Sequence, residues 1–259
     1  RVAGMLDSTE VKKMVSSINW TISDEKGRPK NYLLKNHFLV LDLLNNNNWE
    51  RPVYFAVTTG PDSYMGLQEH FRLEGLAYRL VPVKYPKSRN PNVLGGFATE
   101  IMYDHVMNDF QWGNMDYIEG DGIYMDENNR RMTDNLRLQL SNLSEALIEE
   151  RKEDKAFDVL NKLIEVTPEK NVPYDRIMLP IIETYYELAS QDTLRTIIAG
   201  SSKLTAEEQA RAKEVALAMT ERLFSIFEDD MQYYLTLEPY YYNQVVSDMS
   251  ILRQVNERL

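Results

Sequence analysis

The sequence predicts a mostly helical protein, with an α+β or α/β N-terminal part followed by an all-α part of tetratricopeptide-like helical repeats. Three observations lead to this fold class. Short apolar, strand-like runs alternate with helical patterns near the N-terminus, Pro, Asn and Gly gather at 84–96, and helical periodicity is almost continuous from Thr133 onward. We therefore expect a small α/β domain at residues 1–98, a connecting helix and loop at 99–132, and a helical domain at 133–259.

The N-terminal residues predict a short amphipathic helix followed by a strand. Asp7 and Glu10 resemble a capping box, and apolar residues recur with helical spacing through residues 11–18. Residues 20–22 have strand character, and the polar, glycine-containing segment 24–29 is typical of a turn.

The next element is an apolar run at 37–44, which is too short to reveal its period. A buried helix and a strand both fit, and we favour a helix with Asn36 as its N-cap. The four asparagines at 45–48 should end it, because their amides compete for backbone hydrogen bonds. Pro52 lacks an N–H and suits the first residue of a strand, which we expect to continue over 53–58.

The rest of the N-terminal part predicts two more helices and one more strand. Gly and Pro at 60–61 should close the preceding strand, and a helix over 63–71 then leads to a strand over 78–83. Thr99 is predicted to cap another helix that reaches Phe110.

The C-terminal half carries a spacing that resembles the tetratricopeptide repeat. The first predicted helix carries two bulky residues, then a small residue and another bulky residue. The second carries a small residue, a bulky residue, a further residue that packs between the helices and a closing proline. Small side chains at two of these positions would let two antiparallel helices approach closely. The repeat positions are Leu140, Leu143, Ser144, Leu147, Ala156, Leu160, Leu163 and Pro168.

The following segments continue the helical pattern. Residues 174–198 have the length of a second, degenerate repeat. Thr205 and Glu208 form a T-x-x-E capping box ahead of an apolar stripe over 212–227. We expect a final helix that carries Val245, Met249 and Leu252. A stack of helix pairs of this kind commonly serves as a binding surface.

Composition excludes several function classes. The net charge is −11 without a Lys/Arg cluster, so we expect no nucleic-acid partner. The absence of cysteine excludes disulfides, thiolate nucleophiles and iron–sulfur ligation. The most concentrated apolar run, FLVLDLL at 38–44, is far shorter than a membrane span, so we expect this chain to be soluble by itself. Because the first residue is Arg and no signal peptide follows, we interpret the chain as part of a longer protein.

Catalytic motifs are absent from the sequence. His37, His70 and His105 lie in separate predicted elements without metal-ligand spacing, and there is no P-loop, G-x-G-x-x-G or G-x-S-x-G. We therefore predict no metal, no cofactor and no catalytic residue. Glu69 and Glu74 are the alternative, as a glycosidase-like carboxylate pair.

Two further segments have compositions that could suit ligand binding. The acidic segment 119–129 lacks EF-hand spacing, so an acidic turn is favoured over a calcium loop. Tyrosines at 233–234 and 240–242 suit a sugar or peptide surface, although packing between helices is the favoured alternative.

At "NNNNWERPVYFAVTTGPDSYMGLQEHFRLEGLAYRLVPVK", residues 45–84, the chain resembles the C-terminal region of a family of Gram-negative bacterial multi-pass membrane proteins of unknown function, related to protein O-mannosyltransferases. The resemblance continues through "MYDHVMNDFQWGN", residues 102–114, and "RRM", residues 130–132. The positions that match the family pattern are Trp49, Arg51, Pro52, Tyr54, Glu74, Gly75, Tyr78, Arg79 and Pro82. We interpret them as structural, with Arg51 and Arg79 satisfying carboxylates or carbonyls where two strands meet.

The resemblance implies a larger protein with an N-terminal membrane block of the polyprenyl-sugar-dependent glycosyltransferase type, whose catalytic residues lie upstream of residue 1. This chain would be its non-catalytic tail at the periplasmic face of the inner membrane. Its helical repeats would bind an acceptor polypeptide, a glycan or a partner subunit. The alternatives are a self-contained carbohydrate hydrolase and a soluble helical-repeat scaffold.

Overall fold

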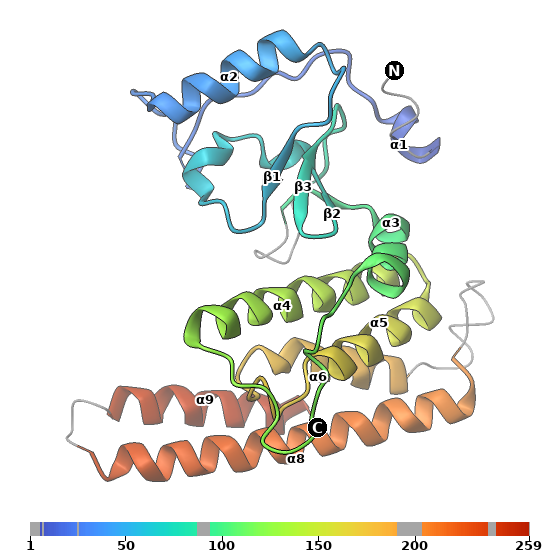
Figure 1. Cartoon of the computed structure of the whole chain (residues 1–259), viewed down its shortest axis with the longest axis vertical. Coiled ribbons are helices and arrows are strands. Elements are labelled where there is room, and N and C mark those ends of the chain that lie inside the picture. Colours follow the sequence, from blue (N-terminus) through green and yellow to red (C-terminus); the bar gives the residue numbers. More distant parts are fainter. Residues whose placement is uncertain are drawn as a thin grey trace. The chain divides into compact units, whose positions relative to one another are not determined.

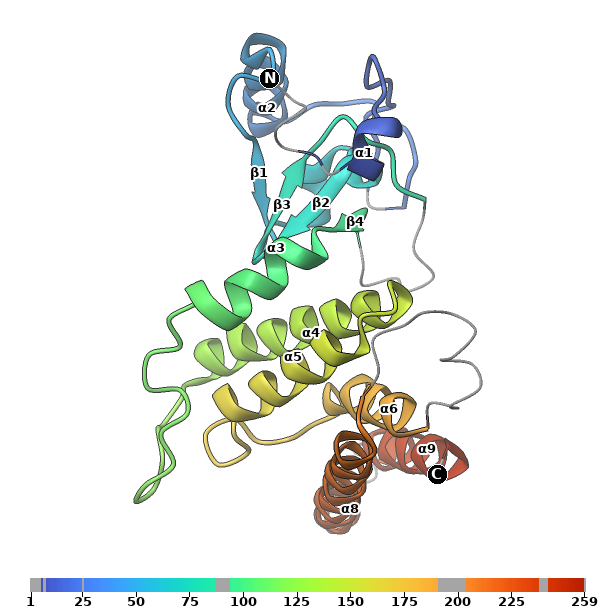
Figure 2. The same ribbon diagram turned by 90° about the vertical axis from the view of Figure 1, so that its right-hand side faces the viewer.

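The computed structural model contains two compact units that divide between Val106 and Met107, here called unit 1 and unit 2. The predicted fold class is confirmed: a small mixed sheet lies near the N-terminus and the chain is mostly helical (Figures 1 and 2). None of the described helices has the length and apolarity that a membrane-spanning helix needs. The structure describes residues 6, 8–24, 26–86, 94–190, 204–237 and 242–258.

Unit 1 contains a four-stranded sheet in the order β1-β3-β2-β4. β3 pairs antiparallel with both β1 and β2, whereas β4 pairs parallel with β2. Because consecutive strands β2 and β3 form a hairpin without a crossover helix, unit 1 is α+β and not a doubly wound α/β unit. The strands are β1 (Tyr54–Ala56), β2 (Phe71–Glu74), β3 (Ala77–Leu80) and β4 (Gly96–Phe97).

An aromatic cluster forms part of the core of unit 1. Phe71 stacks on Tyr78 with ring centroids 5.5 Å apart, and Phe55 packs 4.9 Å from Phe71. Tyr64 meets Phe71 edge to face at 5.2 Å. All four side chains are buried, and burial raises the pKa of Tyr78 to about 12. These contacts bring β1, β2, β3 and the turn before β2 together.

The first predicted helix is shorter than its spacing suggests. α1 spans Ser8–Lys12 only, and Met14 then forms a β-bridge with Val83 while the Val15 N–H donates to the Pro82 carbonyl at 2.8 Å. The Val15 N–H thus donates to the segment after β3 and not to a helical carbonyl.

Two other predicted elements are wrong. Residues 20–22 form no strand, because Ser23 makes only an isolated bridge with Pro29 across the expected turn. The predicted helix at 63–71 is replaced by two 3-10 turns, Pro61–Tyr64 and Gln68–His70, before β2. Left-handed backbone at Met65 (φ 52°) and Gly66 (φ 88°) separates the turns and prevents a continuous helix.

The apolar run at 37–44 is helical, as predicted, within α2 (Lys35–Asn47). Its N-cap is Leu34 and not Asn36; the His37 Nδ1 accepts the Leu34 N–H at 3.1 Å and so serves as the capping acceptor. At the other end Asn48 takes the left-handed conformation with φ 47°, which terminates the helix.

The C-terminal end of α2 is held by a side chain, and most of the helix surface is exposed. Asn47 fixes the chain beyond it, because its Nδ2 donates to the Arg51 carbonyl at 2.7 Å while its Oδ1 accepts the Arg51 N–H. Only His37 of this helix is buried. Phe38, Leu39 and Leu43 are exposed, so α2 presents apolar side chains on the surface of unit 1.

The helix predicted from Thr99 exists as α3 (Thr99–Asp104), continued by a π-helical turn at His105–Asp109. Thr99 is its first residue and not its cap; Ala98 occupies the N-cap position without a side-chain hydrogen bond.

Unit 2 is helical. α4 begins six residues before Thr133, because the Asp126 carboxylate accepts the Asn129 N–H at 2.8 Å and caps it. The predicted capping box at Thr205 and Glu208 is confirmed by reciprocal hydrogen bonds of 2.7 and 3.2 Å. The helices are α4 (Glu127–Glu149), α5 (Glu153–Val166), α6 (Met178–Ala189), α8 (Ala206–Leu235) and α9 (Tyr242–Arg258).

The later expectations for unit 2 are met in part. Buried residues of α8 include Ala212, Ala216, Met219, Leu223 and Phe227, as the predicted stripe requires. In α9, Val245 is buried but Met249 is exposed. The end of segment 174–198, from residue 191, and the side chain of Leu252 lie outside the described residues.

α4 and α5 pack side by side, joined by a three-residue connection that makes them an antiparallel pair (Figure 2). The residues predicted to pack there are buried, with Pro168 half-buried after the pair. The Ser144 hydroxyl donates to the Leu140 carbonyl at 2.9 Å, so its buried polar atom is satisfied within its own helix. The assignment of this pair as a tetratricopeptide repeat stays a prediction.

Arg137, which the sequence did not single out, organises one end of this pair. Its side chain is 0% exposed and donates to the carbonyls of Thr167, Val172 and Pro173 at 2.9, 2.7 and 3.2 Å. Nε also donates to the Thr167 hydroxyl at 3.1 Å. The guanidinium therefore provides hydrogen-bond donors for backbone carbonyls of the segment that follows α5.

We predict that Arg137→Met destabilises unit 2 by about 3 kcal/mol or more, because three carbonyls lose their donor in a buried site. Urea unfolding followed by circular dichroism at 222 nm measures this loss. Arg131→Met is the matched control: Arg131 is exposed on the same helix, and its replacement should change the unfolding free energy by less than about 0.5 kcal/mol. Equal effects of the two substitutions would contradict the assignment.

Candidate functional site

The most developed polar site in unit 1 is a cluster centred on Arg72 of β2. Strand register places Arg72 directly opposite Arg79 of β3, and Arg79 directly opposite Tyr54 of β1. Two arginines opposite each other repel, so this arrangement needs an anion between them. Glu74, two residues along β2 from Arg72, supplies it.

The Glu74 carboxylate accepts hydrogen bonds from three side chains. Oε1 accepts from Arg72 Nε at 3.0 Å and also from Arg72 Nη2, while Oε2 accepts from Arg79 Nη1 at 3.3 Å and from the Tyr54 hydroxyl at 2.8 Å. The Arg79 guanidinium also lies 5.6 Å from the Tyr54 ring centroid. The carboxylate side chain is only 8% exposed, so these bonds hold a largely desolvated charge.

The far side of Arg72 is held by residues distant in sequence. Its Nη1 donates to Glu10 Oε2 of α1 at 2.5 Å, and the Tyr85 hydroxyl donates to Glu10 Oε1. Arg72 and Glu10 are both buried. The cluster thus ties α1 to the sheet through two carboxylates on one guanidinium.

These partners fix the protonation states of the cluster. Burial by itself would raise the pKa of Glu74, but the hydrogen bonds from Arg72 and Tyr54 and the charges of Arg72 and Arg79 outweigh it and lower that pKa. Burial and the neighbouring carboxylate of Glu74 raise the pKa of Tyr54. At neutral pH the site is therefore an ionised carboxylate surrounded by donors.

The other positions of the family pattern support the strands around this cluster. Gly75 takes a left-handed φ of 68° in the turn between β2 and β3, and Tyr78 lies in the aromatic cluster. Pro82 accepts the Val15 N–H. Trp49 is half-buried with φ 59°, a conformation that costs a bulky residue about 1–2 kcal/mol. Pro52 is exposed and precedes β1 by two residues.

The two arginines interpreted as satisfying carboxylates or carbonyls differ. Arg79 binds the Glu74 carboxylate, as expected. Arg51 does not do so: its side chain is exposed and forms no ion pair with any residue that the structure describes, and only its backbone is bound, by Asn47. Residues 48 and 49 have left-handed backbone, and the chain after them is thus held by hydrogen bonds between the Asn47 side chain and the Arg51 backbone and not by a salt bridge.

Glu69 and Glu74, considered as a carboxylate pair, have different surroundings. Glu69 is partly exposed and pairs with Lys84 at 2.9 Å, whereas Glu74 lies among its arginines. A general acid must hold a proton near neutral pH, and the lowered pKa of Glu74 opposes that role. The geometry supports an ion-pair role for each carboxylate.

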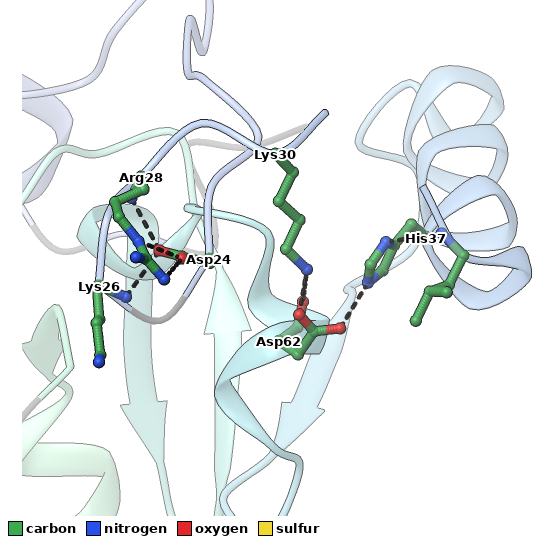
Figure 3. A network of polar contacts seen from close by, with 7 residues as sticks. Asp24, Lys26, Arg28, Lys30, His37 and Asp62 are labelled. Atoms are coloured by element: carbon green, nitrogen blue, oxygen red, sulfur yellow. Dashed lines mark hydrogen bonds and ion pairs between the residues drawn. The ribbon is translucent and has the colours of Figure 1, made fainter. Parts of the chain in front are cut away.

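A second polar network joins α2 to the turn before β2 (Figure 3). The Asp62 carboxylate accepts from Lys30 Nζ and from His37 Nε2, the latter at 3.1 Å. Because His37 Nδ1 accepts the Leu34 N–H, its proton is on Nε2. A nearby turn is closed by Asp24, which accepts the Lys26 and Arg28 N–H groups.

The other two histidines lie in separate elements. His70 is buried with Nδ1 2.9 Å from the Val83 carbonyl, and burial lowers its pKa, which favours the neutral ring. His105 lies in the π-helical turn. Among the described residues no three His, Asp or Glu side chains gather in a way that could hold a metal ion.

The sequence indicated no role for Arg72 or Tyr85, and for Glu10 it indicated a helix-capping role where the structure shows an ion pair with Arg72. One signal was available: in FRLE, residues 71–74, Phe and Leu alternate with Arg and Glu, which places both charged residues on one face of the strand. That Glu10 reaches this face could not be read from periodicity, since 62 positions separate it from Arg72.

Comparison with protein families gave a match to the N-terminal part of the chain. Residues 1–101 match the family model described as TMEM260-associated domain 2. This match covers less than half of the chain and includes α1, the sheet and the Arg72 cluster. The comparison with curated proteins gave no significant match, and neither did the comparison with solved structures.

We predict that the Glu74 ion pairs stabilise the fold above pH 4.5 and weaken below it. The folded-state pKa of Glu74 lies below its ordinary value of 4.5, so its contribution is complete above that value and is lost as pH falls through the folded-state pKa. Urea unfolding at pH 7 and at pH 3.5 should show a smaller loss of unfolding free energy for Glu74→Gln than for the unaltered chain.

The control for this experiment is Glu69→Gln. Glu69 is more exposed and is paired with one lysine, so its replacement should leave the pH dependence close to that of the unaltered chain. A Glu74→Gln variant whose stability falls with pH as steeply as that of the unaltered chain would refute the role assigned to the cluster.

Proposed function

We propose that this chain is a non-catalytic accessory domain of a membrane glycosyltransferase-like protein, located on the periplasmic face of the inner membrane. The observation that carries the proposal is the match of residues 1–101 to TMEM260-associated domain 2, since TMEM260 is a predicted protein O-mannosyltransferase. The resemblance of residues 45–84 to Gram-negative membrane proteins of that kind supports the location. The transfer chemistry would then belong to a membrane block of the larger protein.

The chemistry of unit 1 supports a structural role for this domain. The carboxylates nearest to a catalytic arrangement, Glu10 and Glu74, are held by Arg72 and tyrosine hydroxyls. Such a network fixes the side chains and lowers the pKa of Glu74, which suits a scaffold better than a proton donor.

Exposed apolar surface supports the view that the domain functions within a larger assembly. Phe38, Leu39 and Leu43 of α2 form an exposed apolar group on unit 1. Surfaces of this kind usually contact another protein or a membrane. In the proposed protein, α2 would contact the membrane-embedded part, and the helices of unit 2 would bind an acceptor polypeptide, a glycan or a partner subunit.

We predict that the native protein fractionates with membranes. After an alkaline wash of membranes from the native host, an antibody to this chain should detect a band much heavier than 30.2 kDa in the pellet. A known peripheral protein, released by the same wash, is the control. A soluble band close to 30.2 kDa would refute the proposal and favour the soluble scaffold or the hydrolase.

We further predict that a cysteine introduced into this chain is accessible from the periplasm. The chain has no cysteine, and Tyr124 is 91% exposed, so Tyr124→Cys in the full-length protein offers a single reporter in this domain. A membrane-impermeant maleimide should label it in cells whose outer membrane alone is permeabilised. The full-length protein without the substitution corrects for cysteines elsewhere, and labelling only after lysis would place the domain in the cytoplasm.

The same reagent tests the contact assigned to α2. Leu39→Cys should react more slowly in the full-length protein than in the purified 259-residue chain, because the membrane-embedded part would cover it. Equal rates would show that α2 stays uncovered in the larger protein.

A further inference from the structure

The α8–α9 hairpin exposes an apolar stripe. Tyr242, Val246 and Met249 of α9 are 48, 65 and 58% exposed, and their i, i+4, i+7 spacing places them in one row along the helix. Val245 and Asp248 are buried on the face that packs toward α8. The row therefore lies beside the packed face of α9 and is not part of the contact between α9 and α8.

This stripe continues onto α8. The last turn of α8 adds exposed apolar residues, Tyr233 and Leu235, next to the hairpin connection. An apolar row of this length on an otherwise charged unit indicates a surface that another molecule covers.

Charge indicates the chemistry of that molecule. Glu228, Asp229 and Asp230 of α8 are exposed, and none forms an ion pair with any residue in the described part of the chain. Residues 107–259 contain 16 Lys and Arg against 29 Asp and Glu, whereas residues 1–106 contain 13 against 11. The negative charge of the protein thus belongs to unit 2, and a covering molecule would be attracted if it carried positive charge.

The same observations disfavour other occupants. A second copy of this chain would bring a second set of these carboxylates to the surface, and anionic glycans or phospholipids would be repelled in the same way. A neutral glycan could stack on Tyr242, but the rest of the row, Val246 and Met249, offers it no hydrogen-bond donor. A polypeptide helix with an apolar row and flanking Lys or Arg residues satisfies both the apolar and the acidic part of the surface.

We propose that the α8–α9 hairpin is the docking surface for a basic amphipathic helix of a partner polypeptide. The apolar row of that helix would cover Tyr242, Val246 and Met249, and its cations would pair with the carboxylates at 228–230. Met249 has an adaptable thioether side chain, which suits a surface that accepts related sequences. The inference rests on the proposed function in one respect: it names the partner class of the helical half of the accessory domain.

The test uses the purified 259-residue chain and a fluorescent 18-residue peptide of Leu and Lys whose leucines recur at i, i+3, i+4 and i+7. Fluorescence anisotropy should give at least tenfold tighter binding than a peptide of the same composition with scrambled order. Replacing Val246 and Met249 by serine should weaken binding by about tenfold or more, because the apolar contact is lost. The matched control replaces Leu217 and Met132, exposed apolar residues of α8 and α4, by serine. This control should change the affinity for the peptide by less than twofold.

A second pair of variants tests the charge contribution. Glu228→Gln, Asp229→Asn and Asp230→Asn together should weaken binding severalfold at low salt and have little effect at high salt. Glu207→Gln, Glu214→Gln and Glu221→Gln change the net charge of the same helix by the same amount and should have a smaller effect. Equal effects of the two triple variants would show that the peptide is attracted to unit 2 as a whole, and this would overturn the assignment of the docking site.

Two other results would also overturn the proposal. One is equal affinity for the ordered and scrambled peptides. The other is self-association of the chain in sedimentation experiments that Val246→Ser and Met249→Ser abolish, which would make the occupant a second copy. The outcome is independent of membrane fractionation, so failure of the docking site and failure of the accessory-domain proposal can be distinguished.

Discussion

The structure of unit 1 depends on one carboxylate placed between two arginines. The antiparallel register sets Arg72 opposite Arg79, and without Glu74 these charges would repel across adjacent strands. With Glu74 present, β2 and β3 are joined by ion pairs, and the Tyr54 hydroxyl extends the network to β1. Glu10 then fixes α1 on the same guanidinium. Strand pairing and the charges of the cluster thus account for the positions of Tyr54, Glu74 and Arg79 in the fold.

Unit 2 uses an arginine for a related purpose with different partners. Arg137 donates mainly to carbonyls where the chain leaves α5, whereas Arg72 binds carboxylates. Both side chains are buried. Arg72 joins carboxylates from α1 and β2, whereas the hydrogen-bond acceptors of Arg137 all lie in the segment 167–173. Burying such a charge is favourable only because nearly every donor has an acceptor.

The polar side chains of the Arg72 cluster and the exposed apolar surfaces differ in what they can bind. The polar groups of unit 1 that resemble active-site residues are already bound to one another. Two of the exposed surfaces are apolar, the outward side of α2 and the row on α9. The strong negative charge is confined to residues 107–259, so the two surfaces differ in the molecules that they would attract.

The sequence by itself determined the features that depend on local periodicity and capping. These include the mostly helical fold class, α2, the Thr205–Glu208 capping box and the buried positions of α4, α5 and α8. Hydrophobic spacing and side-chain caps act over a few residues, so they can be read directly.

Only the tertiary structure decided where local preference gave way to long-range pairing. Residues 13–18 abandon a helical pattern because Met14 and Val15 pair with the segment after β3, and the left-handed turn at 65–66 removes the helix expected before β2. The Arg72 cluster likewise joins residues 62 positions apart. Such partners become visible only once the fold is formed, because a periodic pattern shows which face of an element is buried and not what lies against it.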